Sequence, residues 1–85
     1  MVKAFLGIKT CVDYERDVKL ELDKRKEVKE SYLVYGPFDI FARIEVSNLE
    51  ELGNFVRKLK YKDGVDRVQT YLIMEKTSTS PRQAS

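Results

Sequence analysis

The stretch Val34-Tyr35-Gly36-Pro37-Phe38-Asp39-Ile40 decides how this chain folds, because it joins two segments that have the pattern of β-strands. Glycine tolerates positive φ and proline fixes φ near about −65°, so Gly36-Pro37 predicts a tight turn. Asp39 follows the turn among apolar residues and can accept hydrogen bonds from free backbone N–H groups. We therefore expect a β-hairpin whose turn lies beside a small-molecule site.

Both arms of this hairpin show the two-residue period of strands. In residues 38–46 the apolar positions are expected to face the core: Phe38, Ile40, Ala42, Ile44 and Val46. In residues 27–35 we expect two faces. One carries Val28, Glu30, Tyr32 and Val34, and the other carries Ser31, Leu33 and Tyr35. Glu30 is then the only acid expected on the core side.

Two further strands and two helices surround the hairpin. Residues 2–10 and 65–75 have strand patterns, and Gly7 in mid-strand indicates a bulge or a close backbone approach. Asp13 is the expected N-cap of a first helix, which presents an apolar stripe every four residues. A second helix begins near residue 48, and both Ser47 and Asn48 fit a capping box. The sequence leaves the choice between these two caps open.

The order βαββαβ predicts an α+β, ferredoxin-like sandwich, with an antiparallel four-stranded sheet and two helices on one face. Residues 1–75 would form this single domain, and residues 76–85 a disordered polar tail. The face without helices would carry Phe5, Leu33, Tyr35, Phe41, Tyr71 and Ile73. This is more apolar surface than a monomer leaves in water, so we expect a homodimer through that face.

Composition excludes several classes of protein. The chain has 85 residues, of which 42% are apolar and 35% charged, as in a small globular domain. Residues 1–75 carry 14 basic and 14 acidic side chains, which argues against direct nucleic-acid binding. No membrane span or signal peptide is visible, and one cysteine, Cys11, suits a reducing cytoplasm. Because histidine and metal-ligand clusters are absent from the sequence, we expect no metal, no cofactor and no catalytic residues.

Several short motifs, in this order and spacing, resemble the ligand-binding domain of the Lrp/AsnC regulators, also called the regulation of amino-acid metabolism (RAM) domain. They are Val2-Lys3-Ala4-Phe5, Tyr35-Gly36-x-x-Asp39, Leu49-Glu50-Glu51-Leu52, Gly64-Val65 and Thr70. The resemblance covers residues 2–74. Because the chain starts directly at the first strand, it resembles the stand-alone form without a helix-turn-helix domain.

The resemblance implies a dimer through the sheet face, often built into rings of dimers, with free amino acids bound between dimers near the hairpin turn. It implies Gly36 and Asp39 as effector-binding residues, with Thr70 as a weaker member. Two departures concern loop shape. Val12-Asp13 stands where the family often has Pro-Gly, and Lys26 stands where it often has proline. Pro37 also removes one backbone donor that a ligand carboxylate would use.

Three functions remain open at this point. An amino-acid sensor needs an acceptor for the ammonium group and donors for the carboxylate, and Asp39 and the Gly36 turn supply them. The alternative role of Asp39 is to cap its own hairpin. The second function is a ligand-free adaptor that assembles with full-length regulators of the family. The third is a small dimeric α+β barrel enzyme, although the expected core face is apolar and lacks the polar cluster that such an enzyme usually needs.

Overall fold

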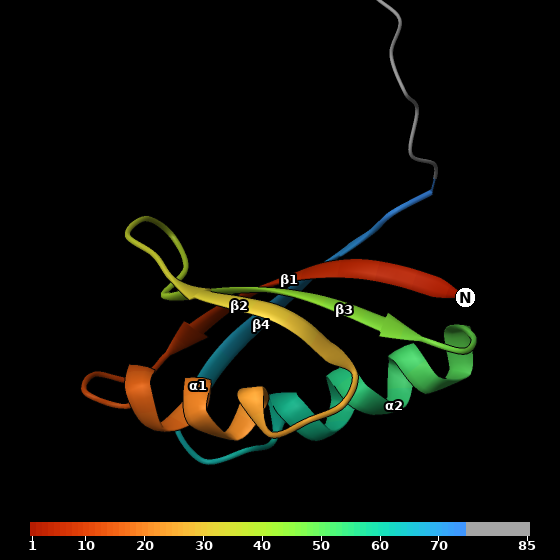
Figure 1. The fold of residues 1–85 in the computed structure, drawn as a ribbon. Helices are drawn as coiled ribbons and strands as arrows, with labels where there is room; N and C mark the ends of the chain where they lie inside the picture. The colour runs from red at the N-terminus through yellow and green to blue at the C-terminus, as the bar shows by residue number, and fades with distance from the viewer. Residues whose placement is uncertain (75–85) are drawn as a thin grey trace, which may run out of the picture.

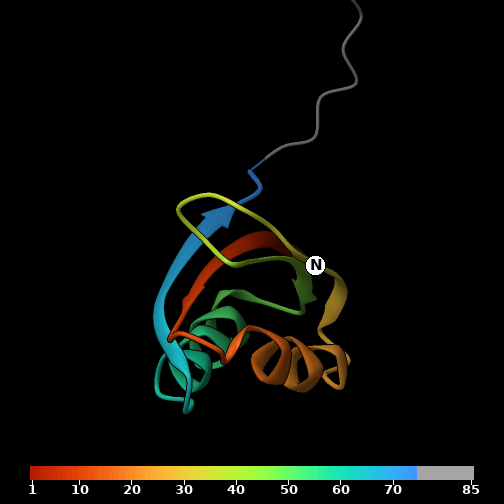
Figure 2. The ribbon, with the colours of Figure 1, turned by 90° about the vertical axis from the view of Figure 1, so that its left-hand side faces the viewer.

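The computed structural model describes residues 1–74, so the predicted tail, residues 76–85, lies outside the described residues. The elements are β1 (Val2–Thr10), α1 (Glu15–Asp23), β2 (Val28–Leu33), β3 (Ile40–Val46), α2 (Leu49–Lys60) and β4 (Val65–Leu72). The four strands form one antiparallel sheet in the order β2-β3-β1-β4. Both helices cover the same face of this sheet (Figures 1 and 2), which confirms the predicted ferredoxin-like fold.

The core lies between the sheet and the two helices. Ala4, Leu6 and Ile8 of β1 and Ile44 of β3 are fully buried there, and Ala42 of β3 is almost fully buried. The helices contribute Val18, Leu22, Leu52, Phe55 and Leu59. Because strand side chains alternate between faces, burying the even-numbered residues of β1 and β3 leaves their odd-numbered residues on the opposite face, called here the open face.

The two helices begin differently. Asn48 caps α2, since its side chain accepts a hydrogen bond from Glu51 N at 2.9 Å, while the Glu51 carboxylate accepts one from Ser47 N at 2.9 Å. The prediction that Asp13 caps α1 is wrong. Asp13 has φ of 71° within a tight turn, and Tyr14 occupies the N-cap position without a side-chain cap. Aspartate tolerates this left-handed conformation better than most residues, so it serves the turn instead.

A β-bulge in β2 changes which side chains face the helices. The pairing with β3 shifts between Val28 and Glu30, so that Lys29 is the extra residue. Beyond the bulge, Leu33 pairs with the fully buried Ile40, which puts it on the helix side of the sheet. The prediction that Leu33 lies on the open face is therefore wrong, and so is the prediction that Glu30 points to the core. Each register step of one residue exchanges the two faces.

The open face carries a row of aromatic rings. Phe5 and Phe41 stack with ring centroids 5.7 Å apart, and Phe41 lies 6.3 Å from Tyr71. Tyr32 joins this face because it pairs with Phe41. Ile73 follows the end of β4 and donates its N–H to the Lys3 carbonyl at 2.9 Å. Tyr35, expected here, instead lies in the loop after β2 and is fully exposed.

A charged cluster borders the aromatic row. Arg43 donates to Glu45 of the same strand at 2.8 Å and to Glu30 of β2 at 3.3 Å, and the second contact is a cross-strand ion pair. This pairing also explains where Glu30 lies after the bulge. The carboxylate that seemed to face the core is on the open face, paired with an arginine.

We expect Leu6→Ala to lower the free energy of unfolding by about 2–5 kcal/mol, because it leaves a cavity in the centre of the core. Leu20→Ala on α1 is the matched control. Since Leu20 is 61% exposed, its loss should change stability by no more than about 0.5 kcal/mol. Urea unfolding of both variants at one protein concentration measures the difference. Equal effects would contradict this assignment of the core.

Candidate functional site

The loop between β2 and β3, residues 34–39, carries the predicted site. It rises from the sheet on the side away from the helices, as the yellow-green segment in Figure 1. Gly36 has φ of 140°, a conformation that disfavours any residue with a Cβ. The base of the loop is closed by a hydrogen bond from Val34 N to the Asp39 carbonyl at 2.9 Å. The turn predicted at Gly36-Pro37 is therefore part of a six-residue loop with a fixed base.

The Asp39 side chain ties this loop to the end of β1. Its Oδ2 atom accepts hydrogen bonds from Thr10 N at 2.9 Å and Thr10 Oγ1 at 3.0 Å, and Lys9 Nζ lies 3.6 Å away. The Thr10 backbone hydrogen bond is the main cause that holds the pKa of Asp39 below its usual value. Asp39 therefore binds the end of β1 through Oδ2 and does not cap its own hairpin. Its Oδ1 atom makes no hydrogen bond within the described residues.

A hollow of about 370 Å³ opens beside Asp39. Its lining combines three charged and three other side chains: Glu15, Arg16, Asp39, Leu33, Val34 and Tyr35. The first two come from the first turn of α1, and the others come from the end of β2 and the loop. The short connection between β1 and α1 brings that first turn close to the end of β1, where Asp39 is held. The hollow therefore contains both signs of charge next to apolar surface.

Thr70 does not share this hollow. Thr70 lies in β4, where it pairs with Leu6 of β1, and it lines a separate open groove of about 460 Å³ beside α2. Gly36 shapes the loop, but the lining of the hollow does not include it. Within one chain the structure therefore brings Asp39 together with Glu15 and Arg16, which the sequence did not single out, and does not bring it together with Thr70.

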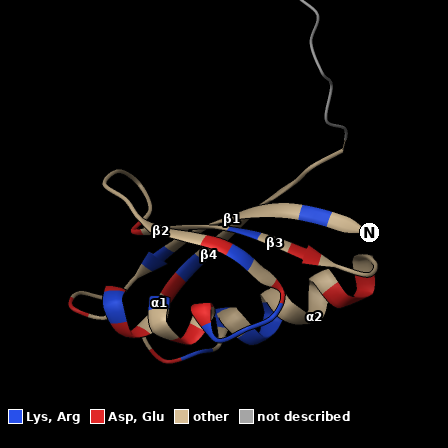
Figure 3. Ribbon diagram, in the orientation of Figure 1, with Lys and Arg blue, Asp and Glu red and all other residues tan. Residues whose placement is uncertain are grey.

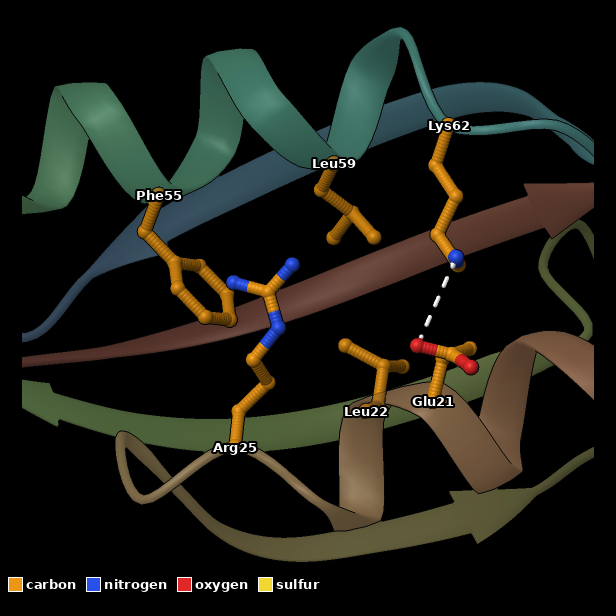
Figure 4. Close-up of a pocket in the computed structure, with 6 residues that line it drawn as sticks. All are labelled: Glu21, Leu22, Arg25, Phe55, Leu59 and Lys62. Atoms are coloured by element: carbon orange, nitrogen blue, oxygen red, sulfur yellow. Dashed lines mark ion pairs between the residues drawn. The ribbon is translucent and has the colours of Figure 1, made fainter.

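The gap between the two helices is filled by packing (Figure 4). Arg25 lies over the ring of Phe55, 5.6 Å from its centroid, and Lys62 pairs with Glu21 at 3.6 Å. The cavity that remains is about 10 Å³, roughly the space for one water molecule. These contacts join α1 to α2 and leave no room for a metabolite.

Charge is mixed over the described surface. Figure 3 shows Lys and Arg interspersed with Asp and Glu on the strands and both helices. Within residues 1–74, no group of three His, Cys, Asp or Glu side chains could hold a metal ion. Nor does this part of the chain contain a helix long and apolar enough to cross a membrane.

A model of the family described as the Lrp/AsnC ligand binding domain matches residues 3–83. The chain belongs to the Lrp/AsnC family. An uncharacterised HTH-type transcriptional regulator of Pyrococcus abyssi is 31% identical over 72 residues, which cover 85% of this chain and 49% of the relative. The chain thus spans about half the length of the curated relatives it matches. These relatives are named as HTH-type transcriptional regulators, so the comparisons favour a regulator domain over the enzyme alternative.

Two solved structures extend this comparison. The structure of FFRP-DM1 is 32% identical with a TM-score of 0.85, covering 87% of this chain and 100% of that one. A transcriptional regulator of Neisseria meningitidis in complex with L-Met has the same fold, with a TM-score of 0.82 at 18% identity. The match covers 93% of this chain and 53% of that one. The Lrp/AsnC domain fold is therefore shared with both shorter and longer proteins.

We expect the Asp39 carboxylate to make folding pH-dependent. Because the folded-state pKa of Asp39 lies below the usual value of the carboxyl, its contribution to stability is fully present above that usual value and is lost as the pH falls through the lowered pKa. Asp39→Asn should lower stability by about 1–2 kcal/mol at neutral pH and remove part of the loss below about pH 4. Thr10→Val keeps the backbone donor, so it should retain most of the pH dependence. Urea unfolding from pH 2 to 7 measures both; an unchanged acid profile in Asp39→Asn would contradict the assignment.

Proposed function

We propose that this Lrp/AsnC domain binds a free amino acid in the hollow beside Asp39, at a contact between subunits, and that binding changes subunit assembly. The observation that carries this proposal is the free Oδ1 atom of Asp39 in a hollow that also contains Arg16 and apolar side chains. A zwitterion requires an anion, a cation or N–H donors, and a surface for its side chain.

Each part of an amino acid has a matching group in the hollow. Asp39 and Glu15 accept hydrogen bonds from the α-ammonium group. Arg16 donates to the carboxylate, helped by the first N–H groups of α1, which have no side-chain cap. Leu33, Val34 and Tyr35 line the rest of the hollow. This lining favours an amino acid with an apolar side chain.

The fold relative from Neisseria meningitidis supports an amino acid as the ligand, because that protein was solved as a complex with L-Met. The open face supports the assembly step. Phe5, Phe41 and Tyr71 form a contiguous aromatic row with Tyr32 and Ile73 at its borders, and Tyr71 is 46% exposed. In our proposal a second copy covers this row by two-fold symmetry, and dimers join further through the loops.

We propose as a second function that this chain assembles through the same open face with a full-length regulator of the family, with which it shares the ligand-binding domain. In that case it would act as an adaptor, with or without a ligand. Mixed oligomers of this chain with such a regulator, detected by native mass spectrometry, would support the adaptor function.

The amino-acid proposal is tested by thermal unfolding with each of the twenty amino acids at millimolar concentration. A ligand at about 100 times its Kd stabilises the fold by about 2.7 kcal/mol, which raises Tm by several degrees in a chain of this size. We expect apolar amino acids to give the largest shifts, and Arg16→Gln and Asp39→Asn to remove them. Arg57→Gln, on α2, is the control and should keep the shift. No shift with any amino acid would contradict the proposal.

Dimerisation through the open face is tested by Phe41→Arg. A charge buried without a partner in this contact costs roughly 3 kcal/mol, which is about a hundredfold in the dimer Kd. Sedimentation velocity at micromolar concentration should then show a monomer. Tyr61→Arg is the control, because Tyr61 is 82% exposed at the end of α2. A Phe41→Arg variant as dimeric as the wild type would exclude this face as the interface.

A further inference from the structure

The loop that carries Asp39 is seated on the open face through one aromatic ring. A Cβ atom on Gly7 would lie 2.7 Å from Cδ2 of Phe38, and 2.9 Å from its Cε2 and Cγ atoms. Real Cβ contacts are essentially never this short, so the ring of Phe38 occupies the place of the missing side chain. Gly7 stands between Leu6 and Ile8, which face the core, so this place is on the open face.

Arg67 covers the same ring from the neighbouring strand. Its guanidinium carbon lies 5.9 Å from the centroid of Phe38, within the range of a cation–π contact. Arg67 belongs to β4 and is paired with Lys9, while Gly7 pairs with Phe41 of β3. The ring is therefore held above the central strand, between an arginine on one side and the aromatic row on the other.

Phe38, whose ring lies over Gly7, and Asp39, whose carboxylate binds Thr10, are consecutive residues, and both are held in place by β1. Asp39 N donates to the Ile8 carbonyl at 2.9 Å, immediately after Gly7 in β1, and the Asp39 carboxylate binds Thr10. A shift of the Phe38 ring therefore moves the backbone that presents Asp39 to the hollow. The bulk of a side chain at position 7 would cause such a shift.

We propose that Gly7 and Arg67 are positioning residues, which hold the ring of Phe38 on the open face and thereby link the shape of the amino-acid hollow to association of the open faces. This inference rests on the proposed function. A second copy that covers the open face would press on the seated ring and favour the ordered loop. By reciprocity, a ligand that orders the loop must favour that association to the same degree.

Hydrogen–deuterium exchange of the loop amides, measured without any ligand, tests whether the contact between the Phe38 ring and Gly7 holds the loop in place. Gly7→Ala should speed exchange at the hydrogen-bonded amides of Val34 and Asp39 by about tenfold or more, while the central amides of β1 and β3 remain protected. Alanine is otherwise preferred to glycine in a strand, so faster exchange reports the clash with the ring. Phe38→Ala should release the loop to a similar degree, and Arg67→Gln to a smaller one.

The double variant Gly7→Ala/Phe38→Ala shows whether Gly7→Ala acts through the Phe38 ring or through a general effect on β1. If the ring is the cause, the alanine substitution of Gly7 has no further effect once the ring of Phe38 is removed, and the two changes are strongly non-additive. If Gly7→Ala alone does not fold, recovery of a folded protein in the double variant gives the same support. Additive effects, or unchanged loop exchange in a folded Gly7→Ala, would show that this contact does not hold the loop.

Protein concentration tests the link to assembly. Loop exchange in the wild type should slow by severalfold as concentration rises through the dimer Kd, whereas Phe38→Ala and the monomeric Phe41→Arg should show no such dependence. Loop exchange independent of concentration in the wild type would overturn the link. These exchange measurements are made without an amino acid, so the two proposals can fail separately. If no amino acid shifts Tm, the proposed function is wrong, but the contact between Phe38 and Gly7 can still hold the loop. If loop exchange does not change in the variants, that contact does not hold the loop, but the proposed function is unaffected.

Discussion

Burial of β1 between β3 and β4 is the constraint on which the rest of the structure depends. One side of this strand places Leu6 and Ile8 at the centre of the core with no exposed surface. The other side places Phe5 in the aromatic row and leaves the space of Gly7 to the ring of Phe38. Its end supplies Thr10, 5% exposed, to the carboxylate of Asp39. The core, the open face and the loop are thus positioned by one element, and a displacement of β1 would alter all three.

The period-two pattern predicted the faces of β1 and of Ile40–Val46 correctly, because β1 and β3 are inner strands with one face packed against helices. It was wrong for Phe38, which precedes β3 and whose ring lies over Gly7 on the open face. It failed in β2, where alternation assumes that each residue of one strand meets one residue of its partner. A bulge breaks this assumption, because it sets two residues of β2 against one residue of β3. As a result Leu33 and Glu30 were assigned to the wrong faces. The same edge strand contributes Tyr32, which the alternation had directed inward.

The candidate site was partly visible in the sequence. An acid after a glycine-proline turn among apolar residues marked Asp39, but its partner Thr10 is 29 residues away and no local pattern connects them. Glu15 and Arg16 were unremarkable as charged residues in a first helical turn. The signal that would have found them is the short connection from β1 to α1, since a tight turn at Asp13 places that first turn at the end of β1. The residue types of the site were visible in the sequence, but the long-range contacts that bring these residues together were not.

Holding the end of β1 and binding a ligand are compatible roles for Asp39 because its two oxygens differ. Oδ2 is held by the backbone N–H and the hydroxyl group of Thr10, which is itself buried. Lys9 contributes less than these hydrogen bonds to the lowered pKa, as expected for a lysine that is 39% exposed. The carboxylate therefore stays ionised at any pH near neutrality and keeps its orientation without a ligand. In the proposed function the ligand ammonium approaches Oδ1, and it meets an anion that the contacts with Thr10 already hold in place.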